Sequence, residues 1–171
     1  MKKLRPLERI FWDDYLATLP SNSRPRKQFV EAAFAGRREG TDALIRLYRL
    51  GKKSAGSSLV KDFESAGDPL PKVGNYWIML DSHERPQLLV KTIRTEINLF
   101  GDIPKAVARA EGEGDLSVSY WKKAHRDFYL SFLTKWGIAD INKAKVITEH
   151  FEILYHSCPV KVGGIAGGLD V

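Results

Sequence analysis

The sequence has little cysteine and no long apolar segment. The single cysteine, Cys158, has no partner for an intramolecular disulfide and offers no zinc-ligand spacing. Apolar runs such as Trp77–Leu80 are far shorter than the ~20 residues of a membrane helix, which excludes an integral membrane protein. No apolar signal-peptide core follows the basic N-terminus. We therefore expect a cytoplasmic protein with no membrane partner.

Motifs of the well-marked hydrolase classes are missing as well. The sequence contains no Gly-x-Ser-x-Gly, no His-Glu-x-x-His and no zinc set. Gly51-Lys52-Lys53-Ser54 is similar to the end of a phosphate-binding loop, but Arg46 stands where that loop has its first glycine. These absences exclude most hydrolases that a short motif identifies.

Positive charge, in contrast, is concentrated in the first third of the chain. The formal net charge is +6, and residues 1–61 hold 14 Lys and Arg against 6 Asp and Glu, while residues 62–171 hold 13 against 15. Lys and Arg that meet phosphates release condensed counterions, which favours a polyanionic partner. The charge pattern predicts a nucleic acid such as RNA, or a nucleotide, as the partner, with a solvated basic face as the alternative.

Hydropathy periods and turn residues predict one domain over residues 1–160, followed by a flexible glycine-rich tail at 161–171. The first expected helix is 7–19, with Leu7, Phe11, Tyr15 and Leu19 in one stripe, and the second is capped by Thr41 or Asp42 and ends at Gly51. A third helix is expected after Pro104, with Val107 and Ala110 turned inward. The fourth is 117–136, with Trp121, Ala124, Phe128 and Phe132 on one face. Expected strands are 76–80, 88–97 and 145–155, the last with Phe151, Ile153 and Tyr155 on one face. The fold class is α+β, with a small, curved, mostly antiparallel sheet flanked by helices.

The most unusual stretch runs from Gly51 to Ser58 and combines two lysines, three serines and two glycines. Glycine lets backbone N–H groups approach an anion, hydroxyls donate hydrogen bonds, and a partly desolvated lysine can have a lowered pKa. These residues alone slightly favour the alternative, a polar surface turn.

The second unusual stretch is Glu111-Gly112-Glu113-Gly114-Asp115. Its carboxylates can hold a hard cation or supply a general base, although the ~12-residue pattern of a calcium loop is absent. The acidic residues before the 117–136 helix can instead complement the dipole of that helix, which does not explain the two glycines. In the nearby cluster of Tyr120, Trp121 and His125, we expect Trp121 in the core rather than stacked on a base.

An ordered set of segments resembles the ASCH domain family, and specifically its longer bacterial branch. The segments that carry the resemblance are Phe11–Leu16, Gly51–Leu59, Pro69–Tyr76, Thr92–Glu96, Ala110–Ser117, Tyr120-Trp121 and His125. The resemblance implies a PUA-like β-barrel with helices around a cleft and a role on RNA or nucleosides. Some members are ribonucleases, and small members remove an acetyl group from acetylated cytidine.

The small deacylating members carry the pattern Gly-x-Lys-x-x-Thr and a distant glutamate. By position, this resemblance assigns the lysine to Lys53 and the glutamate to Glu113. The threonine position falls on Gly56, which has no hydroxyl, so Ser57 or Ser54 is the expected replacement.

The leading prediction is an RNA-binding hydrolase, a ribonuclease that cleaves single-stranded RNA in a basic cleft. The alternatives are an amidohydrolase acting on acetylated cytidine and a non-catalytic RNA-binding module. The predicted catalytic residues are Lys53, Glu113 and Ser57, and the predicted substrate-binding residues are Tyr48, Lys52, Ser54, Gly56, Arg94 and Tyr120. No residue is assigned as a metal ligand, and whether the reaction needs a Mg²⁺ or Mn²⁺ ion is left open. No protein partner is expected. Lys53 would stabilise developing negative charge and Glu113 would act as base, so we expect these side chains within a few ångströms of each other.

Overall fold

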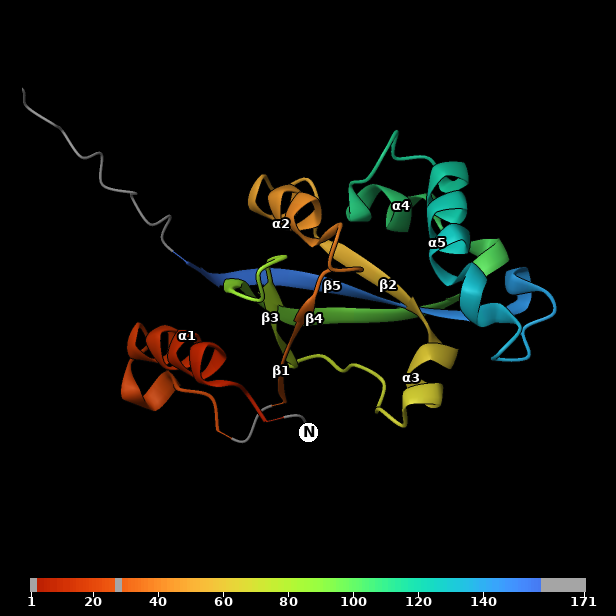
Figure 1. The fold of residues 1–171 in the computed structure, drawn as a ribbon. Helices are drawn as coiled ribbons and strands as arrows, with labels where there is room; N and C mark the ends of the chain where they lie inside the picture. The colour runs from red at the N-terminus through yellow and green to blue at the C-terminus, as the bar shows by residue number, and fades with distance from the viewer. Residues whose placement is uncertain (1–2, 27–28, 158–171) are drawn as a thin grey trace, which may run out of the picture.

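The computed structural model describes residues 3–26 and 29–157 and shows a five-stranded sheet with helices around it (Figure 1). The α-helices are α1 (Pro6–Ala17), α2 (Thr41–Arg49), α3 (Val60–Ala66), α4 (Lys105–Glu111) and α5 (Val118–Leu133), the 3₁₀ helices are η1 (Ser21–Ser23), η2 (Phe100–Asp102) and η3 (Ile141–Lys143), and the strands are β1 (Val30–Phe34), β2 (Ala55–Leu59), β3 (Tyr76–Leu80), β4 (Pro86–Leu99) and β5 (Lys145–His156). Cys158 and the predicted tail at 161–171 lie outside the described residues. Within the described ranges, no helix combines the length and apolar character needed to cross a membrane.

The sheet has the strand order β1-β3-β4-β5-β2. The β1–β3 pair is parallel, and the three other pairs are antiparallel. The long strands β4 and β5 curl the sheet into a half-barrel whose two edges are β1 and β2 (Figure 1). This arrangement confirms the expected α+β class with a curved, mostly antiparallel sheet.

Helix α1 covers one face of the sheet. Phe11, Trp12 and Tyr15 are buried there, and the ring of Trp12 meets the ring of Tyr76 edge-on with centroids 5.1 Å apart. The predicted stripe is therefore wrong at Leu7, which is 60% exposed, and Trp12 takes its place in the core.

Helix α2 covers the other face, where Ile45 and Tyr48 pack on buried residues of β3, β4 and β5. Thr41 begins this helix without capping it: its hydroxyl accepts a hydrogen bond from the backbone N–H of Ala35 (2.9 Å) and donates one to the carbonyl of Leu80 (2.8 Å). The cap position is Gly40, so the predicted capping by Thr41 or Asp42 is wrong. The predicted left-handed Gly51 after the helix is confirmed at φ +66°.

Helices α4 and α5 build a further core cluster at the far end of the sheet. Val107 and Trp121 are buried there as expected, whereas the inward positions predicted for Ala110 and Phe132 belong to Ala108 and Tyr129. Phe132 is 37% exposed instead, and its ring stacks on that of Trp136.

The predicted common face of Phe151, Ile153 and Tyr155 on β5 is also wrong. Leu89 of β4 pairs with Tyr155 of β5, but the next residue, Val90, pairs with Ile153, so the register shifts by one residue between these two pairs. A bulge of this kind reverses the alternation of side chains beyond it. Phe151 therefore packs in the α2 cluster and Tyr155 in the α1 cluster, while Ile153 is 39% exposed.

Strand β2 has the sequence Ala-Gly-Ser-Ser-Leu, and the predicted polar surface turn at this place is wrong. Gly56 lies opposite Glu149 and Ser57 opposite Thr148 in the antiparallel pairing with β5. Glycine and serine have low strand propensity, so the pairing with the long partner strand decides the conformation here.

Candidate functional site

A cavity of about 330 Å³ lies between the two edges of the half-barrel. Strands β1 and β2 both contribute to its wall. Helices α2, α3, α4 and α5, strands β3 and β5 and connecting segments that include Lys53 and Glu113 supply the rest. Aromatic rings line much of it, from Phe34, Tyr48, Phe63, Trp77, Phe128, Tyr129 and Phe151. A space of this size and lining is typical of a small-molecule site.

Lys53 lies in the wall of this cavity and is only 5% exposed. Its ammonium donates to Oε2 of Glu111 (3.0 Å), to Oε1 of Glu113 (2.7 Å) and to the backbone oxygen of Glu111 (3.3 Å). The expected proximity of Lys53 and Glu113 is confirmed. All three N–H bonds of the ammonium are directed at protein oxygens.

Opposite charges determine the protonation of this buried group. Burial alone would lower the pKa of Lys53, but the neighbouring charges, led by the Glu111 carboxylate, outweigh it and hold the pKa above its ordinary value. For Glu111 burial acts toward a higher pKa, yet the Lys53 charge keeps the pKa of this carboxyl below its usual range. Partial desolvation, which can lower the pKa of a lysine, is thus outweighed here, and Lys53 is a poor base.

Backbone contact brings the two segments together. The N–H of Ser54 donates to the carbonyl of Ala110 (2.8 Å), and a Cβ on Gly112 would lie 1.9 Å from the carbonyl oxygen of Lys52. Gly112 also has φ +68°, which favours glycine. This close approach explains the first glycine of the Glu111–Asp115 stretch. The second, Gly114, leaves space for the ring of Tyr120.

Ser57 lies on β2, next to the Lys53 group. Its Oγ is 2.7 Å from Oγ1 of Thr148, and its hydroxyl is close enough to Glu111 to lower the pKa of that carboxyl. Ser57 also lines the cavity, so a hydroxyl, a carboxylate and an ammonium meet at one wall.

Tyr48 and Gly56 are the predicted substrate-binding residues that line the cavity. Burial raises the pKa of the Tyr48 phenol, whose Oη donates to the carbonyl of Ala55 (3.2 Å), so this side chain is a neutral part of the wall. A Cβ on Gly56 would meet that Oη at 3.4 Å, an ordinary contact.

The other predicted substrate-binding residues lie away from the cavity lining. Arg94 is on the sheet surface, where its guanidinium contacts His150 (2.6 Å) and Glu96 (3.1 Å). Tyr120 is 42% exposed and lies beside a smaller hollow near α5. Lys52 and Ser54 contribute backbone atoms to the contact with α4. Trp121 is buried as expected, and its Nε1 donates to Oε1 of Glu111 (2.6 Å).

Glu149 on β5 also lines the cavity and was not among the predicted residues. Burial raises its pKa to about 7; the hydroxyl of Thr92, which donates to its Oε2 (2.7 Å), acts in the opposite direction, and the charge of Glu31 adds to the rise. Side chains two residues apart on a strand share a face, and Glu149 lies between Ile147 and Phe151, which are both buried. This alternation was the available sequence signal that Glu149 faces the interior.

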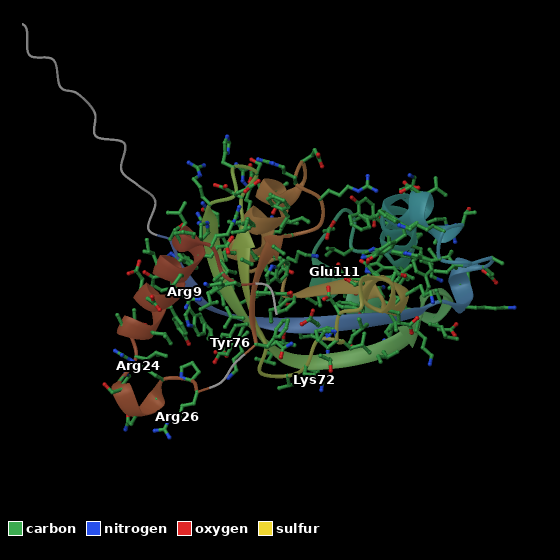
Figure 2. The ribbon with its side chains drawn as sticks, turned by 60° about the horizontal axis from the view of Figure 1, so that its bottom comes forward. Arg9, Arg24, Arg26, Lys72, Tyr76 and Glu111 are labelled. Carbon is green, nitrogen blue, oxygen red and sulfur yellow. The ribbon has the colours of Figure 1, made fainter. Side chains whose placement is uncertain are left out.

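The cavity is acidic, and the predicted basic cleft is wrong. Its lining carries the carboxylates Glu31, Asp62, Glu111, Glu113 and Glu149. Among the described residues, Lys53 is the only lysine or arginine in this lining. Part of the basic excess lies elsewhere, because Figure 2 shows Arg9, Arg24 and Arg26 at the α1 end of the molecule, apart from Glu111.

Despite these acidic residues, no group of three or more His, Cys, Asp or Glu in the described part of the chain is arranged to hold a metal ion. The described residues therefore offer no ligand set of this kind for the Mg²⁺ or Mn²⁺ ion considered from the sequence.

Comparison with known proteins gives a family match over most of the chain. The ASCH domain model matches residues 11–155. An ASCH domain from Lactobacillus crispatus JV V101 is similar at 23% identity and a TM-score of 0.82, over 91% of this chain and 99% of that one. A protein from Enterococcus faecalis V583 is similar at 24% identity and a TM-score of 0.71, over 85% and 86% of the two chains. No curated protein matches significantly. At these identities, the two structures show a shared fold.

Proposed function

Because the chain belongs to the ASCH domain family, we propose that it is a hydrolase that removes an acyl group from the base of a nucleoside. The observation that carries this proposal is the group at the cavity wall, in which the buried Lys53 ammonium and the Glu111 carboxylate lie beside the Ser57 hydroxyl. These are the parts that acyl transfer requires: a nucleophile, a proton acceptor and a positive charge for the oxyanion.

In this reaction the Oγ of Ser57 attacks the acyl carbonyl carbon, and Glu111 takes the hydroxyl proton. The C–N bond then breaks and the base nitrogen leaves with that proton. Water hydrolyses the acyl-serine, which releases the free acid and restores Ser57. Lys53 stays protonated throughout, since its pKa lies above the ordinary value.

Lys53 has three hydrogen-bond acceptors before substrate binds. The longest of its bonds is the one to the backbone oxygen of Glu111, at 3.3 Å. The oxyanion formed during attack takes over this donor, while the shorter bonds to Glu111 and Glu113 hold the ammonium in place. The charge is therefore positioned before the reaction begins.

The charge of the cavity favours this reaction over cleavage of a phosphodiester. Five carboxylates against one lysine repel a phosphate group that enters the cavity, whereas an acylated base adds no negative charge. Phosphates can stay outside, near Arg37, whose guanidinium lies 4.9 Å from the ring centroid of the lining residue Phe128. The same site can thus take an acylated base from a free nucleoside or from an RNA strand.

The test is incubation of the protein with N4-acetylcytidine, and separately with RNA that contains it, followed by chromatography of the products. We expect cytidine from the wild type and a loss of at least 100-fold in rate for Ser57→Ala and Lys53→Met. Ser21→Ala, which removes an exposed hydroxyl on η1, is the matched control and should keep full activity.

Two outcomes would overturn the proposal. One is cleavage of the RNA chain that depends on Lys53 and occurs without deacylation, which would identify a ribonuclease. The other is tight RNA binding with no turnover of either substrate, which would identify a binding module.

A further inference from the structure

Four residues form a continuous part of the cavity that the hydrolysis does not use. Glu31 on β1 lies opposite Trp77 on β3 in the parallel pairing. The rings of Trp77 and Phe151 lie 5.5 Å apart, and Glu149 precedes Phe151 by two residues on the same strand. Glu31 is in turn close enough to Glu149 to raise the pKa of that carboxyl. We call these four residues the acidic–aromatic wall.

This wall combines the two features that bind organic cations. Aromatic faces attract a cation through their quadrupole, and carboxylates attract it directly. The indole of Trp77 is held in place by its Nε1, which donates to the carbonyl of Ala33 (3.2 Å). Glu149 is held by Thr92.

Carboxylates outnumber lysine and arginine in the described lining of the cavity. The one lysine there, Lys53, is already paired with Glu111 and Glu113. Asp62 on α3 adds a further carboxylate, and His125 on α5 stacks on Trp121, with ring centroids 3.9 Å apart. The cavity as a whole therefore favours a ligand with positive charge.

We propose that the acidic–aromatic wall binds nucleosides whose base carries a positive charge through N-alkylation, and binds them more tightly than neutral nucleosides of the same shape. The inference rests on the proposed function only in taking the ligand to be a nucleoside. It adds a second ligand class to the site, because an alkylated base without an acyl group binds without being hydrolysed.

Proton release follows from this arrangement. Without ligand, Glu149 is protonated in about half of the molecules near pH 7. A neutral base leaves this proton in place, whereas a cationic base favours the carboxylate and expels it. Affinity for the cation therefore rises with pH, and between pH 6.0 and pH 7.5 the ionised fraction of a group with a pKa of about 7 increases roughly eightfold.

The experiment is calorimetric titration of the full chain with 3-methylcytidine, which is positively charged, and with 3-methyluridine, which has the same methyl group on an uncharged ring. We expect 3-methylcytidine to bind at least tenfold more tightly at pH 7.5, and its affinity to fall roughly eightfold at pH 6.0. The affinity for 3-methyluridine should not rise between pH 6.0 and pH 7.5.

Glu149→Gln should weaken the preference for charge and remove the pH dependence, because glutamine still accepts the Thr92 hydrogen bond but does not ionise. Glu152→Gln, an exposed glutamate on the same strand, should leave both unchanged.

The inference is overturned if the two nucleosides bind equally, if neither binds, or if Glu149→Gln keeps the pH dependence. Turnover of N4-acetylcytidine in those cases would leave the proposed hydrolase standing. Tight binding of 3-methylcytidine without any deacylation would support cation binding by the acidic–aromatic wall and contradict the proposed hydrolase activity.

Discussion

The raised pKa of Glu149 makes the stability of the protein depend on pH in an unusual direction. In the folded protein this carboxyl keeps its proton up to a pKa of about 7, whereas an unfolded glutamate loses it near pH 4.3. Between these two values the folded state binds more protons than the unfolded state, so the free energy of unfolding falls as the pH rises. Each pH unit between these two pKa values is worth up to about 1.4 kcal/mol, which limits the total loss of unfolding free energy to about 3.7 kcal/mol by pH 8.

Glu149→Gln removes this loss. Glutamine accepts the same hydrogen bond from Thr92 and carries no charge at any pH. We therefore expect the free energy of unfolding of the variant, relative to that of the wild type, to rise by up to about 2.5 kcal/mol between pH 5 and pH 8.

The assay is urea denaturation of both proteins at pH 5, 6, 7 and 8, with Glu152→Gln as the exposed control. The difference between wild type and Glu149→Gln should grow most steeply between pH 5 and pH 7, and the control should show no such growth. A difference that stays constant over this range would refute a buried protonated Glu149.

Two further predictions concern the contact between the 51–54 segment and α4. Lys53→Met leaves Glu111 buried without its cation, and loss of one partner of a buried ion pair costs about 3–5 kcal/mol in urea denaturation. The matched change Lys61→Met, in an exposed pair with Glu64, should cost less than about 1 kcal/mol, and equal costs for the two would contradict the burial of Lys53. Gly112→Ala should lower the melting temperature far more than Gly137→Ala, because both glycines have positive φ but only the Cβ at 112 meets a backbone oxygen, at 1.9 Å. Similar melting temperatures for the two alanine variants would show that strain alone, and not the close approach, accounts for the effect.

The regular elements with strong patterns could be predicted from the sequence. The strands β3, β4 and β5 and the helix α5 follow from β-branched runs and from apolar residues that recur within one element, and these are local properties of the chain. The errors inside them, such as the opposite faces of Phe151 and Tyr155, come from a bulge that exists only through pairing with β4.

The candidate site was predictable only in part. Lys53 and Glu113 were found from the family resemblance, and the structure brings them together. Glu111 was missed as a partner, because only the turn of α4 against the backbone of Lys52 shows which carboxylates reach the ammonium. Glu149 was missed because β5 carries several charged residues, and only the fold shows that Glu149, unlike the exposed Glu152, faces the cavity.

The sequence by itself determined the α+β class, the family and the excess of positive charge near the N-terminus. Only the tertiary structure decided the sign of the charge inside the cavity. The carboxylates of the lining come from β1, α3, α4, the segment just after α4, and β5, which are far apart in the chain. Curling of the sheet brings them to one space, while Arg9, Arg24 and Arg26 lie at the α1 end (Figure 2). Net charge is a sum over residues and is independent of their positions, whereas the potential in a cavity depends on distance and burial, which the fold alone supplies.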